Sequence, residues 1–349
     1  MEKIIEKIKE KIELFGLNPQ NGESISDKDC YIGAFLLGFA EYLKNSKITS
    51  LQEIEQLQRT FNEDLVQKLI EEKIVPKNSV AITLEAITHK VRHLFQKSTS
   101  KKISEDLSII QKELILIVQK LYILSDTAKS EIAKNFTKSI NNDVKILIFG
   151  YSIEVIYSLI YARQKGKIFT VYIANSNKKD ISDKMIEVLK KYEIDFHLIS
   201  DISISLYLSK IDFILTGADA ICENGGIINK VGTHVIAMCG NVYKKPFYVL
   251  VSSLRYLKMY VIESNHLELL NKKYSNNDEG IVDFTPPEFI TLFFTDKGIL
   301  TPNAICDEII QLFFANVKAL RGLLLSAENR TKRNSAAQSL RSNRSSPAP

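Results

Sequence analysis

The spacing of apolar residues changes from a helical to a strand period close to Val144. Before that point, apolar residues recur every three or four positions; Ile5, Ile8 and Ile12, for example, share one face of a predicted helix from Glu2 to Phe15. Further helices are predicted over residues 29–43, 80–95 and 103–140. A helix is also expected to begin at Ser50, where Glu53 completes a capping box.

After Val144, short apolar runs alternate with helical segments. The runs are VKILIF, IFTVYIA, DFHLI and IDFILT, at residues 144–149, 168–174, 195–199 and 211–216. Helical periods are found between the first three of them, at 152–164 and 181–192. This alternation predicts a mostly parallel sheet with helices on both faces. We therefore expect an α-helical N-terminal domain, residues 1–140, followed by an α/β Rossmann-like domain, residues 141–325.

The remaining residues, 326–349, contain almost no large apolar side chains and are predicted to form a basic disordered tail. The basic residues of this tail are Arg330, Lys332, Arg333, Arg341 and Arg344. With 349 residues, 45% hydrophobic and 25% charged, the chain has the composition of a globular protein. Its net charge of +5 is small and draws on the tail, so no direct nucleic-acid partner is expected.

Cysteine usage and hydropathy favour a reducing, aqueous location. The four cysteines show no CxxC spacing, which favours free thiols over disulfides or a zinc site. The first residues do not resemble a secretory signal, and no apolar run approaches the roughly 18 residues that cross a bilayer. We expect a cytoplasmic protein without a membrane partner.

The chain lacks the common cofactor motifs. Gly150, after the first predicted strand, is followed by Tyr-Ser-Ile-Glu instead of completing GxGxxG, and no P-loop is present. His89 and His93 have the spacing of zinc ligands on a helix, but no third ligand lies near them in sequence. We expect no cofactor and no metal, and two histidines at a partly exposed helix edge.

The candidate site lies in the stretch from Thr216 to Arg255. The run from Ile211 to Leu215 is predicted to be a buried strand, so Asp219 follows its carboxyl end, where open α/β sheets bind ligands. The alternative for Asp219 is a carboxylate that caps a turn.

Glycines and polar residues follow Asp219 closely. Gly225 and Gly226 allow a ligand to approach the main chain, while Asn229 and Lys230 supply an amide and a cation. A phosphate group suits this combination. Ser152, in the loop after the first strand, completes the set of candidate ligand-binding residues. For Lys230 the alternative is a solvated loop lysine.

Two blocks of this sequence resemble a known family. The run GADAICENGGIINKVGT, followed by KPFYVLVSSLR, is similar to the signature of the family that contains the alpha, beta and delta subunits of eukaryotic translation initiation factor 2B. The same family contains sugar-phosphate isomerases. A second block, VDFTPPEFITLFFTDKGILTPNAICDEII, resembles the C-terminal end of the family's alpha subunits. The resemblance covers residues 145–310 and extends into the preceding helices.

The departures from the family pattern matter for catalysis. In the family's isomerases, catalysis is attributed to a cysteine after the first strand and to the aspartate of the GAD motif. Asp219 matches the aspartate, but Gly150 stands at the cysteine position and offers neither a proton nor a nucleophile. The run from Ala174 to Asn177 lacks the arginine found in related proteins, and Ile153 replaces a further basic residue. Phosphate binding is therefore expected to be weaker than in those related proteins.

The resemblance therefore implies a non-catalytic, regulatory subunit of the guanine nucleotide exchange factor for translation initiation factor 2. Such a subunit homodimerises through its α/β domain, joins the beta, gamma, delta and epsilon subunits into a decamer, and helps to sense the phosphorylated alpha subunit of initiation factor 2 in the integrated stress response. Lys90 and Arg92 are expected to be exposed and to face that phosphoprotein. The alternative is a sugar-phosphate aldose-ketose isomerase acting on ribose 1,5-bisphosphate or methylthioribose 1-phosphate.

Overall fold

The structure is a computed structural model of the whole chain. It describes residues 2–14, 28–46, 48–60, 65–76, 78–100, 107–175, 179–261, 268, 271–272 and 281–313. By its contacts the chain divides into two compact units, Met1–Cys306 and Asp307–Pro349, and all contacts discussed below lie within the first. The predicted tail lies outside the described residues, and the domain boundaries predicted at residues 140 and 325 stay predictions.

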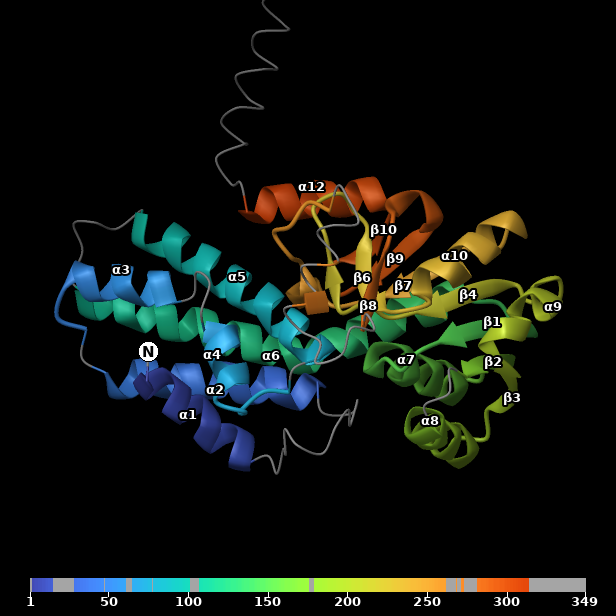
Figure 1. The fold of residues 1–349 in the computed structure, drawn as a ribbon, viewed down its shortest axis with the longest axis horizontal. Coiled ribbons are helices and arrows are strands. Elements are labelled where there is room, and N and C mark those ends of the chain that lie inside the picture. Colours follow the sequence, from blue (N-terminus) through green and yellow to red (C-terminus); the bar gives the residue numbers. More distant parts are fainter. Residues whose placement is uncertain are drawn as a thin grey trace, which may run out of the picture. The chain divides into compact units, whose positions relative to one another are not determined.

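Helices make up the N-terminal region, as predicted (Figure 1). They are α1 (Glu2–Leu14), α2 (Lys28–Asn45), α3 (Leu51–Thr60), α4 (Leu65–Glu71), α5 (Ser79–Ser100) and α6 (Leu107–Ser139). The predicted start of α3 is confirmed, because the backbone N–H of Glu53 donates to Ser50 Oγ at 3.2 Å. The Glu53 carboxylate accepts from the Thr49 N–H at 2.8 Å, which satisfies a second donor at the start of the helix.

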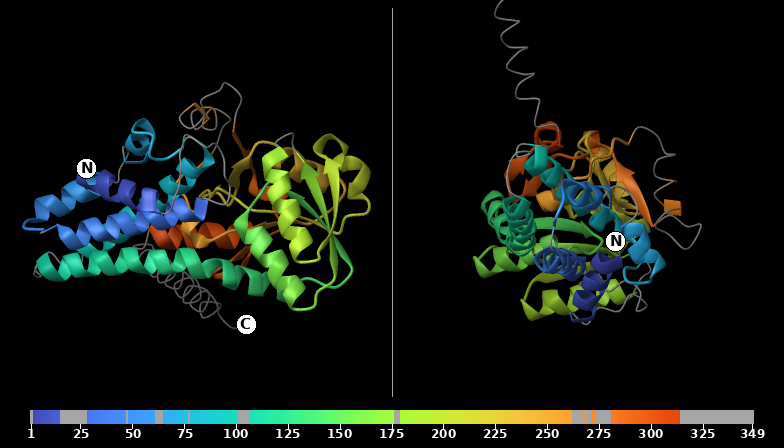
Figure 2. Two further views of the ribbon diagram at one scale, coloured as in Figure 1. Left: turned by 90° about the horizontal axis from the view of Figure 1, so that it is seen from below. Right: turned by 90° about the vertical axis from the view of Figure 1, so that its left-hand side faces the viewer.

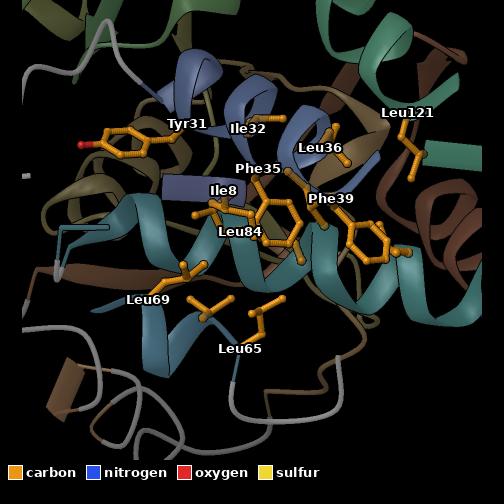
Figure 3. Close-up of a cluster of buried hydrophobic side chains, with 14 of the residues drawn as sticks. Ile8, Tyr31, Ile32, Phe35, Leu36, Phe39, Leu65, Leu69, Leu84 and Leu121 are labelled. Atoms are coloured by element: carbon orange, nitrogen blue, oxygen red, sulfur yellow. The ribbon is translucent and has the colours of Figure 1, made fainter. Parts of the chain in front are cut away.

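These helices bury an apolar cluster between them. Figure 3 shows side chains of different helices that face one another there, with Phe35 and Phe39 of α2 at the centre. The ring of Phe39 lies 5.7 Å from that of Phe95 on α5. Burial of each such side chain contributes about 1.5–3 kcal/mol. The cluster continues into Ala220 and Leu254, so the helices and the segments beyond residue 216 share one core.

The second part of the chain contains a mostly parallel sheet of seven strands. The strands are β1 (Val144–Phe149), β2 (Phe169–Asn175), β3 (Asp195–Ser200), β4 (Phe213–Thr216), β7 (Phe247–Leu250), β9 (Leu292–Thr295) and β10 (Gly298–Leu300). Their order is β10-β9-β7-β4-β1-β2-β3, and every neighbouring pair is parallel except β9 with β10. This confirms the predicted fold class.

Helices follow the strands and cover the sheet. They are α7 (Ile153–Gln164), α8 (Lys179–Lys191), α9 (Ile204–Leu208) and α10 (Thr233–Val242), and Figure 1 shows α7 and α10 on opposite sides of the sheet. The chain passes from β1 to β2 on one side, whereas β4 lies on the other side of β1. The connections that begin with the loops after β1 and β4 therefore lead to opposite sides of the sheet, and a crevice is expected at the carboxyl ends of these strands. The long helix α6 runs from the helical region to the sheet, where it packs on α7 and β9 (Figure 2).

A second, antiparallel sheet was not predicted. Its order is β5-β6-β8, formed by β5 (Ala220–Ile221), β6 (Ile227–Lys230) and β8 (Val282–Thr285). Three 3-10 turns, η2 (Asp201–Ser203), η3 (Ser253–Arg255) and η4 (Pro287–Phe289), and the helix α12 (Pro302–Phe313) complete the described elements. Across the described ranges, every helix is too short or too polar to span a bilayer.

Candidate functional site

A small pocket lies at the carboxyl ends of β1 and β4, the crevice described above. It contains about 260 Å³ of space between atoms, including its opening to solvent. The enclosed part of this space holds about one water molecule, so a larger ligand would extend into the opening. The lining residues are Tyr151, Ser152, Ile153, Glu154, Ala218, Asp219, Asn229 and Arg255.

The loops after β1 and β4 approach closely because of Gly217. A Cβ atom at this position would overlap the side chain of Ser152, so a larger residue would push the two loops apart. Asp219 follows in the β4 loop and is buried, with 2% of its surface exposed. Its backbone N–H donates to the Ile228 carbonyl at 2.9 Å, and its own carbonyl accepts from Thr83 Oγ1 at 3.1 Å. The main chain of Asp219 is therefore held on both sides.

A buried ion pair forms one wall of the pocket. Arg255 Nη2 lies 2.7 Å from Glu154 Oε1, and each side chain is 5% exposed. Arg255 Nη1 also donates to the Ala218 carbonyl at 2.6 Å, and Ser152 Oγ donates to Glu154 Oε2 at 2.7 Å. These bonds connect the loops that follow β1, β4 and β7. The sequence analysis missed both charged residues, although Arg255 ends the block that resembles the family signature.

Ser152 is also the N-cap of α7. Its Oγ accepts from the Val155 N–H at 3.5 Å, a long bond, and its extended backbone conformation is the usual one for this position. The N-terminus of α7 therefore meets the pocket, and the partial positive charge there favours an anionic group such as the Glu154 carboxylate.

Asn229 enters the pocket from β6. Its Nδ2 donates to the hydroxyls of Thr216 and Thr233, both at 3.1 Å, which fixes the orientation of the amide. The next residue, Lys230, is not among the lining residues, and its Nζ lies 5.8 Å from the centre of the Phe149 ring.

Gly225 and Gly226 lie in the turn between β5 and β6, away from the pocket lining. A Cβ on Gly225 would come within 2.8 Å of the Pro302 carbonyl oxygen, and one on Gly226 would overlap the ring of Phe284. Close packing accounts for both glycines. Of the six predicted ligand-binding residues, the structure thus brings Ser152, Asp219 and Asn229 together at one pocket, and their role in binding stays a prediction.

The pocket offers carboxylates for acid-base chemistry but no thiol. Gly150 follows β1, and none of the lining residues is a cysteine. Cys222 is nearby in sequence, but it is fully buried, and burial raises the pKa of its thiol, which keeps it protonated. The run from Ala174 to Asn177 departs from the family pattern. Its first residue, Ala174, is buried in β2, and residues 176–178 lie outside the described part of the chain.

Two sequence expectations concern α5, one for its histidines and one for its basic residues. No group of three potential metal ligands occurs in the part of the chain that the structure describes, and burial lowers the pKa of His93. Lys90 was expected to be exposed, and this is wrong. Lys90 is 6% exposed, because its Nζ turns inward and donates to the Ser253 carbonyl at 2.8 Å. Arg92 is half-buried.

The sequence was compared with known proteins. The model of the initiation factor 2 subunit family matches residues 36–302. Translation initiation factor eIF2B subunit alpha of Dictyostelium discoideum is 34% identical over 208 residues, which are 54% of this chain and 65% of that protein. The corresponding subunit of Caenorhabditis elegans is 29% identical over 203 residues, 53% of this chain and 64% of that protein. The chain thus spans just under two thirds of the length of these two relatives.

An enzyme and two solved structures are also similar. Ribose 1,5-bisphosphate isomerase of Methanocaldococcus jannaschii is 28% identical over 153 residues, 41% of this chain and 50% of that protein. The crystal structure of eIF2B beta from Chaetomium thermophilum has a TM-score of 0.68 at 16% identity, covering 88% of this chain and 90% of that one. A chain of the tetrameric eIF2B-beta2-delta2 complex from C. thermophilum has a TM-score of 0.66 at 17% identity, covering 89% and 93%. The likeness to these structures shows the same fold, and the match of the family model over most of the sequence shows that the chain belongs to the initiation factor 2 subunit family.

Proposed function

We propose that this chain is a regulatory, non-catalytic subunit of the cytoplasmic guanine nucleotide exchange factor for translation initiation factor 2. It pairs with a second copy of itself through its α/β part and joins the beta, gamma, delta and epsilon subunits into a decamer. It also helps the complex to respond to the phosphorylated alpha subunit of initiation factor 2. The similarity to eIF2B alpha of Dictyostelium discoideum supports this assignment.

The observation that carries the proposal is an exposed apolar surface on the α/β part, which we call the α9–α10 face. It consists of Ile202, Leu206, Val235, Met238 and Val242, with exposed fractions of 92, 74, 56, 39 and 77%. Ile202 belongs to η2, which contacts α9, and α9 contacts α10, so the side chains lie on neighbouring elements. On α10 the three apolar residues recur at intervals of three and four, which places them on one side of the helix. An exposed apolar patch of this kind is typical of a protein–protein interface.

A second copy of this chain is the partner that we propose for the α9–α10 face. An apolar patch is complementary to itself, and most homo-oligomers are two-fold dimers in which the same patch meets on both subunits. The solved eIF2B-beta2-delta2 complex, whose chain has the same fold, contains two copies of each subunit.

The dimer is tested by sedimentation of the purified chain. We expect a dimer at micromolar concentration, and we expect Leu206→Glu and Val242→Glu to give monomers with an unchanged circular dichroism spectrum. Leu116→Glu is the matched control, because Leu116 is 53% exposed on α6, distant from this face in the fold. A monomeric wild-type chain, or dissociation of the control alone, would contradict the dimer.

The pocket is proposed to bind a sugar phosphate without turning it over. Isomerisation of an aldose to a ketose moves a proton between two carbons, and the pocket has no thiol to partner Asp219. The similarity to the archaeal isomerase favours that activity as the second candidate. Incubation with ribose 1,5-bisphosphate or methylthioribose 1-phosphate distinguishes the two, because turnover that is lost in Asp219→Asn would establish the enzyme.

The regulatory role is tested by nucleotide release from initiation factor 2, measured with exchange complexes that contain or lack this chain. The chain alone is expected to have no exchange activity. In the complex it should promote assembly and should deepen the inhibition caused by phosphorylated initiation factor 2. Equal inhibition with and without the chain would leave it, at most, a scaffold.

A further inference from the structure

Two buried side chains of helix α5, in the helical region, contact two of the loops that form the pocket. Thr83 Oγ1 donates to the carbonyl of Asp219 at 3.1 Å, and Lys90 Nζ donates to the carbonyl of Ser253 at 2.8 Å. Thr83 is 1% exposed and Lys90 6%. Both acceptors are main-chain atoms of the loops that form the pocket, one in the loop after β4 and the other in the loop after β7.

The ammonium group of Lys90 constrains the loop after β7 strongly. A buried charge is unfavourable unless hydrogen bonds and nearby π electrons replace its hydration. Here the Nζ has the Ser253 carbonyl and also lies 5.6 Å from the centre of the Tyr256 ring. Movement of Ser253 away from α5 would remove one of these contacts from a buried charge.

Asp296 holds the same residue from the opposite side. The N–H and the hydroxyl of Ser253 donate to the two carboxylate oxygens of Asp296 at 2.6 and 2.8 Å. Ser253 is thus fixed between α5 and the turn that joins β9 to β10. Arg255 ends the same short 3-10 turn, so the position of Ser253 determines where the guanidinium meets Glu154.

We propose that Lys90 and Thr83 are positioning residues for the pocket, so that α5 and a ligand in the pocket are energetically coupled. Lys90 orients Arg255 through Ser253, and Thr83 orients Asp219. This inference rests on the proposed ligand-binding role of the pocket. Coupling between two sites is reciprocal, so a bound ligand must in turn stabilise α5 at Thr83 and Lys90.

Four variants test the coupling. Thr83→Val removes the hydroxyl at nearly constant shape, and Thr83→Ser, which retains the hydroxyl, is its control. Lys90→Met removes the charge but keeps a long unbranched chain. Lys97→Met is its control, since Lys97 is an exposed lysine on the same helix. For each variant, amide hydrogen exchange is followed by mass spectrometry, and ribose 1,5-bisphosphate binding is measured by calorimetry.

In Thr83→Val we expect exchange to accelerate about fivefold to tenfold at residues 218–221, which corresponds to the loss of about one hydrogen bond. In Lys90→Met the acceleration is expected at residues 253–257. Both variants should bind the sugar phosphate about tenfold more weakly, and both controls should match the wild type. Exchange in β3, which contacts neither residue, should not change.

Two results would overturn the inference. One is unchanged exchange at both pocket loops in both variants, and the other is uniform acceleration that includes β3, which would mean general destabilisation. The proposed ligand is judged separately. If the wild-type chain fails to bind the sugar phosphate, the ligand assignment falls, while the exchange data still decide whether α5 positions the loops.

Discussion

Replacement of Arg255 by methionine should destabilise the fold strongly. Arg255 and Glu154 are each 5% exposed and 2.7 Å apart, so the variant leaves the Glu154 carboxylate buried without its cation. The Ala218 carbonyl also loses the donor that lies 2.6 Å away in the wild type. Removal of one partner of a buried ion pair lowers the free energy of unfolding by about 3–5 kcal/mol, and we expect a loss in that range.

The pair itself contributes much less than this loss. Two charges give up their hydration when they are buried, and apolar replacements of a whole pair are often neutral. In the double variant Glu154→Leu/Arg255→Met the remaining penalty comes from the unsatisfied Ala218 carbonyl and the Ser152 hydroxyl, about 1–3 kcal/mol. The double variant should therefore be more stable than Arg255→Met alone.

Urea denaturation of the wild type, the two single variants and the double variant gives the coupling energy directly. We expect the sum of the two single-variant losses to exceed the loss of the double variant. The difference, which is the coupling energy between Glu154 and Arg255, should be at least about 2 kcal/mol. Additive losses, or a loss below about 1 kcal/mol in Arg255→Met, would refute the argument that this pair is buried and interdependent.

Three further predictions concern other parts of the fold. Asp283 caps the start of α10 by accepting from the Gly232 and His234 N–H groups, and burial raises its pKa to about 6. Because the folded state holds this proton more tightly than the unfolded state, the free energy of unfolding should fall by about 2–3 kcal/mol as the pH rises from about 4 to 6. Asp283→Asn should abolish that fall in urea titrations at several pH values. Gly226→Ala should lower the free energy of unfolding by about 1–3 kcal/mol, since its Cβ would overlap Phe284, and an unchanged urea midpoint would contradict the packing. Ser50→Ala should lose about 1 kcal/mol through the cap of α3, whereas Ser46→Ala, outside that cap, serves as a comparison.

Sequence periodicity was sufficient to predict the helical region and the parallel sheet. The strands β1, β2, β3 and β4 are runs of large apolar residues, and α7 and α8 each have an apolar period, so the βα alternation in this part of the sheet is visible locally. The β5-β6-β8 sheet lacks such a signal. Its first strand has only two residues, and β6 carries Asn229 and Lys230, which are uncommon in strands. Gly225 and Gly226 were consequently assigned to a ligand loop instead of a hairpin turn.

The site was only partly predictable for a related reason. Asp219 could be assigned to the site because ligands of open α/β sheets bind at the carboxyl ends of strands. Applying this rule requires only that the preceding strand be recognised in the sequence. The pairing of Glu154 with Arg255 depends on the meeting of the β1 and β7 loops, which no local pattern encodes. Lys90 was expected at the surface because lysine is almost never buried, and its acceptor is a main-chain carbonyl that any residue could supply.

Three of the buried charged residues near the pocket have a common consequence. Lys90, Glu154 and Arg255 lie within one continuous set of contacts, from α5 through Ser253 to the loops after β7, β4 and β1. Buried charges add little net stability compared with apolar residues, but each accepts only a narrow range of partner positions. We hypothesise that they keep the helical region and the α/β part in one fixed relation at the pocket. A partner that displaces α5 must then break a buried contact at the pocket wall, which is how binding to the helical region could change the occupancy of a site on the sheet.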